Sequence, residues 1–83
     1  MALTKLEVQE KVGSIITEQL GTFDNIGPES KLVEDLNADS LDCVELMVDL
    51  EDSFNIEIDD EQAARLVTVG DICNYIAEKT GAE

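Results

Sequence analysis

Ser40 stands near the middle of an acidic stretch that reads EDLNADSLDCVELMVDLEDSF over residues 34–54, at the expected start of a helix. The wider segment 32–62 contains no Lys or Arg. Its carboxylates make up 12 of the 20 acidic residues in the chain: Glu34, Asp35, Asp39, Asp42, Glu45, Asp49, Glu51, Asp52, Glu57, Asp59, Asp60 and Glu61. A hydroxyl in such surroundings could act as a nucleophile, belong to a calcium loop, cap a helix, or accept a group that another protein attaches.

Nucleophilic catalysis fits the sequence poorly. A Ser hydroxyl needs an activating base, which is often His, and the chain contains no His. Lysine could serve as the base, but none lies between Lys31 and Lys79. The residues therefore do not predict an enzyme, and we expect no catalytic residue.

A calcium loop is suggested by Asp35, Asn37 and Asp39, which match the first, third and fifth positions of an EF-hand. The match ends there, because the sixth position has Ser40 instead of Gly and the twelfth has Leu46 instead of Glu. We expect loose binding of divalent cations by the carboxylates and no specific metal site.

Two uses of Ser40 remain open on the residues alone. Serine is common at the start of a helix, where its side chain caps the first turn. A serine exposed at a helix start is also well placed to carry a covalently attached group. The helix that positions Ser40 is therefore central to its interpretation.

The charge of the chain limits its partners. With 83 residues and a net charge of −15, the chain repels nucleic acid and anionic membranes and attracts basic protein surfaces. Cys43 and Cys73 lack the spacing of a zinc or redox motif and are expected to be reduced thiols. No membrane span and no signal peptide is predicted. We expect one domain, residues 1–83, in a monomeric and cytoplasmic protein.

Apolar spacing predicts an all-α fold, a small four-helix bundle. Three longer helices are expected at about residues 5–20, 40–53 and 69–79, with a short third helix at about residues 60–66. The long loop at residues 21–38 contains Gly21, Gly27 and Pro28, which disfavour regular structure. Its apolar residues, expected to pack onto the core, are Phe23, Ile26, Leu32 and Leu36. The expected helix caps are Thr4 with Glu7, Asp39, Asp59 with Gln62, and Thr68.

The predicted helix at residues 40–53 has two apolar faces. The core stripe consists of Cys43, Leu46, Met47, Leu50 and Phe54. The second stripe, Leu41, Val44 and Val48, could pack beneath the long loop or remain exposed for a partner. Four acids lie beside it, Asp42, Glu45, Asp49 and Asp52, and Glu51 on its other flank is a weaker candidate. We favour a docking surface, because a helix in so small a bundle needs only one apolar face.

The stretch EDLNADSLDCVELMVDLEDSFNIEI resembles the modification-site region of acyl carrier proteins. The resemblance spans nearly the whole chain and includes the DSLD start, the acidic helix and TVGDICNYI near the end. The tripeptide DSL alone is a weak signal. The resemblance is strong because DSL is followed by VEL and LEDSF, in a chain of the family's length and acidity. Asn37 stands where the family commonly has Gly, and Cys43 where Thr, Gln or Leu is frequent; these departures affect only which synthase is served.

The resemblance implies a freestanding carrier of dissociated fatty-acid synthesis. It implies that Ser40 receives 4′-phosphopantetheine from coenzyme A, and that the terminal thiol of this cofactor carries acyl chains as thioesters. Asp39 is implied to lie near the magnesium and coenzyme A phosphates during loading. The aliphatic interior is expected to shelter the acyl chain.

The implied partners are a holo-carrier synthase (a phosphopantetheinyl transferase), ketoacyl synthases, reductases, dehydratases and acyltransferases. They are expected to dock on the second stripe and its acidic border. Two alternatives are a carrier for a polyketide or another dedicated acyl pathway, and an acidic interaction module without a prosthetic group.

Overall fold

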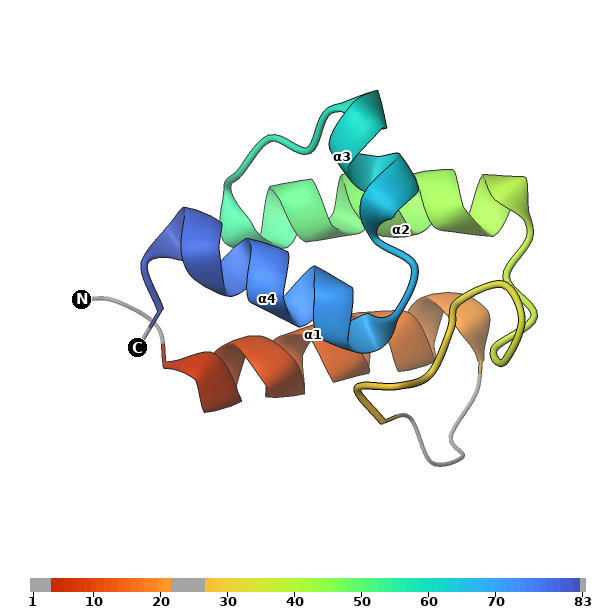
Figure 1. Cartoon of the computed structure of the whole chain (residues 1–83), viewed down its shortest axis with the longest axis horizontal. Helices are drawn as coiled ribbons and strands as arrows, with labels where there is room; N and C mark the ends of the chain where they lie inside the picture. Colours follow the sequence, from red (N-terminus) through yellow and green to blue (C-terminus); the bar gives the residue numbers. More distant parts are fainter. Residues whose placement is uncertain (1–3, 22–26, 83) are drawn as a thin grey trace.

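The computed structural model describes residues 4–21 and 27–82, which form an all-α bundle of α1 (Lys5–Leu20), α2 (Ser40–Phe54), α3 (Asp60–Arg65) and α4 (Val69–Thr80). α1 packs against both α2 and α4, and the short α3 lies beside α2 in Figure 1. Within the described ranges there is no strand, only an isolated bridge between Lys31 and Thr68. The predicted fold class is confirmed. No helix in the described part of the chain is long and apolar enough to cross a membrane.

The core is almost entirely aliphatic, as the sequence predicts. Each of α1, α2 and α4 buries one stripe, and the fully buried side chains are Val8, Val12, Ile16, Leu32, Leu46, Leu50, Ile72 and Ile76. Leu32 is therefore a core residue contributed by the loop, and Leu36 packs against the core at partial exposure. The predictions for Phe23 and Ile26 lie outside the described residues.

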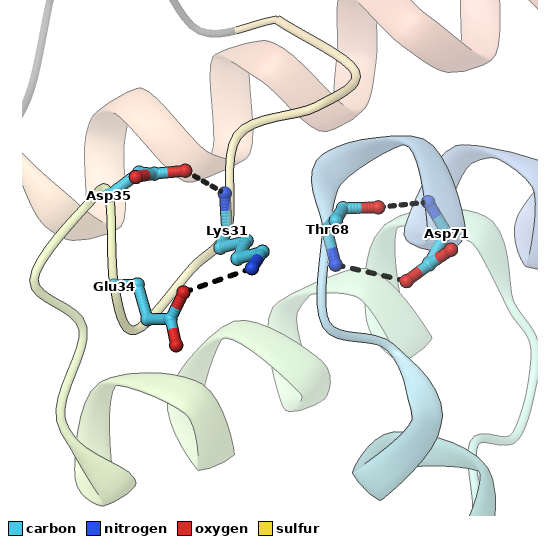
Figure 2. Close-up of polar contacts among 5 residues, drawn as sticks. All are labelled: Lys31, Glu34, Asp35, Thr68 and Asp71. Carbon is cyan, nitrogen blue, oxygen red and sulfur yellow. Dashed lines mark hydrogen bonds and ion pairs between the residues drawn. The ribbon is translucent and has the colours of Figure 1, made fainter.

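Side-chain caps begin the helices at the predicted places. Thr4 and Glu7 form the capping box of α1, with each bond at 3.1 Å. Thr68 caps α4 because its hydroxyl accepts from the Asp71 N–H at 3.0 Å, and the Asp71 carboxylate accepts from the Thr68 N–H at 3.1 Å (Figure 2). Hydrogen bonding, chiefly with the Thr68 backbone, lowers the pKa of the Asp71 carboxyl. The Asp71 carboxylate therefore stabilises the fold at pH values above the ordinary Asp pKa. This stabilisation is lost as the pH falls through the lowered pKa of Asp71.

α1 ends at Leu20, as predicted, whereas the other three helices end one residue away from the predicted position. α2 continues one residue further, until Asn55 adopts the left-handed conformation with φ 54°. α3 ends one residue earlier, because Leu66 leaves the helical region at φ −87° and ψ 79°. α4 extends to Thr80, whose hydroxyl donates to the Ile76 carbonyl at 2.8 Å.

α3 is held less firmly than the other helices. It has six residues, and none of them is buried. Asp59 caps it by accepting from the Gln62 N–H at 2.8 Å, but no reciprocal bond from Gln62 occurs among the described residues, so only half of the predicted capping box is present. The position of α3 therefore depends on the segments before and after it.

The loop after α1 is tied to the segment between α3 and α4 and to the first two residues of α4. Three main-chain hydrogen bonds make this connection: Leu32 N to Val67 O (3.1 Å), Val69 N to Ser30 O (2.9 Å) and Gly70 N to Pro28 O (2.9 Å). Figure 2 shows Lys31 on the loop near Thr68 on the facing segment. Gly70 permits this approach, because a Cβ atom built there would lie 2.8 Å from the Pro28 carbonyl oxygen.

Gly70→Ala should therefore destabilise the protein, by about 1–3 kcal/mol, because the added methyl group overpacks this contact. Gly13→Ala is the matched control, since Gly13 lies within α1 and a Cβ placed there has nothing within 4 Å apart from its chain neighbours and the adjoining backbone of the helix. We expect that change to stabilise the protein by roughly 0.5–1 kcal/mol, because Ala is the better helix former. Urea unfolding of both variants measures the difference. Equal stabilisation by the two changes would show that the loop moves away from α4 at no cost.

Candidate functional site

Ser40 is the first residue of α2 and is exposed to solvent. The cap of this helix is Asp39, as predicted, whose carboxylate accepts from the Asp42 N–H at 2.8 Å. The Asp42 carboxylate in turn accepts from the Asp39 N–H at 3.1 Å, which completes a capping box beyond the single cap predicted from the sequence. No hydrogen bond within the described residues involves the Ser40 hydroxyl. The serine is therefore not the helix cap, and its oxygen is free for chemistry.

The calcium-loop pattern does not assemble into a metal site. The Asp35 carboxylate accepts from the Lys31 N–H at 2.9 Å (Figure 2), and Asp39 is occupied as a helix cap. The residues that the structure describes contain no group of His, Cys, Asp and Glu side chains that could hold a metal ion.

A groove of about 780 Å³ begins beside Ser40 and separates α2 from α3. One wall comes from α2, with Ser40, Cys43, Val44, Met47, Val48 and Glu51. The other wall comes from α3 and its flanks, with Ile58, Asp60, Ala63, Ala64, Leu66 and Val67, and the loop residues at the mouth are Lys31, Leu32, Val33 and Glu34. Most of these side chains are apolar, so the groove offers an apolar surface next to a free hydroxyl. The sequence predicts only that an acyl chain enters the aliphatic interior, whereas the structure shows a groove between α2 and α3.

The second apolar stripe of α2 is exposed. Leu41 is 64% exposed, Val44 60% and Val48 49%. The alternative that these residues pack beneath the long loop is therefore wrong. Val44 and Val48 also form the edge of the groove, so the strip and the groove make one continuous apolar surface.

The acids beside this stripe differ in their surroundings. Glu45 and Asp52 are exposed, whereas Asp42 and Asp49 are half-buried. Asp42 belongs to the capping box described above. Glu51, the weaker candidate, accepts from the Ile58 N–H through its carboxylate and so has a bonding partner within the protein.

Cys43 lies one turn after Ser40 and lines the groove at partial exposure. Burial raises the pKa of its thiol, and the negative charges of Asp42 and Asp39 add to the effect. The thiol therefore stays protonated at neutral pH and is a weak nucleophile. Cys73 is buried in α4, which also raises its pKa, and both cysteines are free, as predicted.

Unpaired carboxylates dominate the surface around the site. One ion pair occurs among the described residues, between Lys31 Nζ and Glu34 at 3.1 Å (Figure 2), and it raises the pKa of Lys31. The net charge of −15 is thus screened mainly by ions from solution.

We expect salt and divalent cations to raise the melting temperature, because both reduce repulsion among the carboxylates. The measurement is a thermal melt in increasing NaCl, and then with magnesium or calcium at constant ionic strength. A melting temperature that responds to neither would mean that the charges are too dispersed to affect stability.

Comparisons with known proteins decide the family. The family model described as "Phosphopantetheine attachment site" matches residues 10–76. The chain is 48% identical to the acyl carrier protein of Picosynechococcus sp. over 77 residues, which cover 92% of this chain and 95% of that protein. The chain belongs to the acyl carrier protein family. An acyl carrier protein of Thermotoga maritima is 46% identical over 90% of this chain and 94% of its own length.

Solved structures agree with this family. A solution structure from Anaplasma phagocytophilum matches this carrier with a TM-score of 0.89 and 36% identity over 100% of this chain and 99% of that one. The acyl carrier protein from Enterococcus faecalis matches with a TM-score of 0.79 and 38% identity over 92% of this chain and 98% of that one. Members of this family hold acyl groups for other proteins and are not enzymes themselves, so the chain is a carrier, and 4′-phosphopantetheine is its cofactor.

The described residues fit such a cofactor. Ser40 presents a free hydroxyl, and the N–H groups of the first turn of α2 favour a negatively charged phosphodiester at this helix end. The groove beside Ser40 offers an apolar surface to whatever the cofactor carries.

Proposed function

We propose that Ser40 is the residue that carries 4′-phosphopantetheine, and that the chain transports acyl intermediates of fatty-acid biosynthesis. The observation that supports this most strongly is an exposed Ser40 hydroxyl, free of hydrogen bonds to other described residues, at the mouth of an apolar groove. The thiol of the bound cofactor supplies the thioester linkage to the acyl group. The groove between α2 and α3 receives the acyl chain.

Asp39 has two proposed roles. It fixes the start of α2, so that Ser40 stays at the first helical position whether or not the hydroxyl is modified. Asp39 also directly precedes Ser40 in the sequence. Its carboxylate would therefore lie close to the magnesium ion and the coenzyme A phosphates while the transferase attaches the cofactor.

Partner enzymes dock on α2 in this proposal. Leu41, Val44 and Val48 form the apolar contact, and the acids Asp42, Glu45, Asp49 and Asp52 attract a basic rim on the partner. The partners are a phosphopantetheinyl transferase and the separate ketoacyl synthases, reductases, dehydratases and acyltransferases of fatty-acid synthesis, which we place in the cytoplasm.

The pathway is tested by comparing two condensing enzymes. The carrier is loaded with the same acyl group and offered to a freestanding fatty-acid ketoacyl synthase and to a polyketide ketosynthase. We expect kcat/KM to be higher with the fatty-acid enzyme by at least about tenfold, which corresponds to about 1.4 kcal/mol. Equal values, or a preference for the polyketide enzyme, would assign the carrier to another acyl pathway and leave its loading at Ser40 unaffected.

A further inference from the structure

The groove has a defined direction along α2. Its α2 lining residues recur at helical spacing from Ser40 at one end to Glu51 at the other. These two residues are 11 positions apart in one helix, so their Cα atoms are separated by about 16 Å along the axis. A chain that enters beside Ser40 therefore extends toward Glu51.

Glu51 organises the end of α2 with both its backbone and its side chain. Its carbonyl oxygen accepts from the N–H groups of Asn55 and Ile56, the latter at 3.1 Å. Its carboxylate oxygen Oε2 accepts from the Ile58 N–H at 2.8 Å, across seven residues and at a partly buried site. The carboxylate thus fixes the path of the chain after α2 has ended.

Ile58 is the residue that this path delivers to the groove. It is only 8% exposed, belongs to the core and lines the groove on the side opposite α2. A second tether holds the same segment from α4, where the Tyr75 hydroxyl donates to the Glu57 carbonyl at 3.3 Å. α3 buries no residue fully and packs only Ala63 partly against the core, so such tethers contribute to the position of this wall.

We propose that Glu51 is a positioning residue for the cargo: its carboxylate holds Ile58 as the far wall of the groove and so sets the length of acyl chain that gains contact. The inference rests on the proposed function, in which the acyl chain occupies this groove. Short chains end before they reach Ile58 and do not depend on Glu51, whereas longer chains do.

The test uses three variants. Glu51→Ala removes the acceptor, and Glu51→Gln keeps one carbonyl oxygen for the Ile58 N–H without the charge. Glu78→Ala is the charge control, because Glu78 is an exposed acid on α4, away from the groove and the docking face, and its carboxylate makes no hydrogen bond within the described ranges. Each variant is loaded by a phosphopantetheinyl transferase with a butyryl or an octanoyl group, checked by mass, and melted in magnesium-free buffer.

We expect the melting temperature of the wild type to rise from the butyryl to the octanoyl form. Glu51→Ala should lose at least half of that rise, and Glu51→Gln and Glu78→Ala should retain it. An equal drop for both acyl forms of Glu51→Ala would show that Glu51 supports only the fold, and would overturn the inference. Absence of cofactor on the wild-type protein would instead contradict the proposed function.

A second measurement needs no variant. Amide hydrogen exchange of Ile58 in the wild type should be slower in the octanoyl form than in the butyryl form, because the longer chain shields and fixes this wall. The Gly21 N–H, which bonds to the Thr17 carbonyl at the end of α1, is the internal reference and should exchange equally in both. Unchanged exchange at Ile58 would also overturn the inference.

Discussion

Ser40→Ala should abolish loading of 4′-phosphopantetheine and leave the fold intact. The substitution removes the only hydroxyl at the start of α2, and the helix keeps its cap because Asp39 and Asp42 form the capping box. We expect an unchanged circular dichroism spectrum and a stability within roughly 0.5 kcal/mol of wild type, as for other surface substitutions. Intact mass after incubation with coenzyme A and a phosphopantetheinyl transferase measures the loading.

Ser53→Ala is the control for this experiment. Ser53 is exposed in the last turn of the same helix, so its replacement shows whether losing any exposed serine of α2 impairs loading. The control should load normally. Cofactor found on Ser14, Ser30 or Ser53 of the Ser40→Ala protein would contradict the assignment.

The second large effect concerns docking, where charge and apolar contact should separate in the kinetics. Glu45 and Asp52 are both exposed and lie seven residues apart on α2, two turns or about 10 Å along the axis. Reversing both to Lys should slow association with a basic partner by roughly tenfold or more at low salt, because steering by charge acts on the association rate. The loss should nearly vanish at about 1 M salt, where the Debye length is about 3 Å.

The matched control reverses Glu10 and Glu78 to Lys. Both are exposed acids, on α1 and α4, so the net charge changes equally while the face of α2 stays intact. A smaller effect on association is expected from this control. If the two double variants slow association equally, attraction depends on the overall charge and α2 is not a specific docking face.

The apolar strip should act on dissociation. Val44→Ala and Val48→Ala together should speed release of a ketoacyl synthase or a transferase, with little salt dependence, because each methylene buried on docking contributes roughly 0.8 kcal/mol. The free protein should keep its stability, since the two side chains are 60% and 49% exposed. Stopped-flow binding at two salt concentrations measures both rates. An unchanged dissociation rate would remove the strip from the interface.

Much of the fold could be predicted because its signals are local. A capping residue followed by a 3.6-residue apolar period locates each helix, and the same period separates the buried stripe of α2, such as Leu46 and Leu50, from the exposed Val44 and Val48. The position of Ser40 at the first turn follows from the same local signals.

The groove and its far wall could not be predicted, because they depend on tertiary contacts without a sequence period. The Ile58 N–H reaches the Glu51 carboxylate across a non-helical connection, so Glu51 was interpreted only as an acid on the surface of α2. The capping boxes of α2 and α4 were predicted only in part. The third helical residue is Asp42 in α2 and Asp71 in α4, and its carboxylate accepts from the N–H of the cap residue. An acid at this position is a recognisable signal in the sequence. The loop residues Lys31 to Glu34 also line the groove, and the pairing of Lys31 with Thr68 that holds them there is a tertiary contact.

The most direct test of the central claim is the location of the cofactor on the unaltered protein. The purified chain is incubated with coenzyme A, magnesium and a phosphopantetheinyl transferase of broad specificity, and then analysed by intact mass and by fragmentation of its peptides. We predict a single phosphopantetheine adduct, on Ser40. An unmodified chain, or an adduct at another residue, would contradict the account.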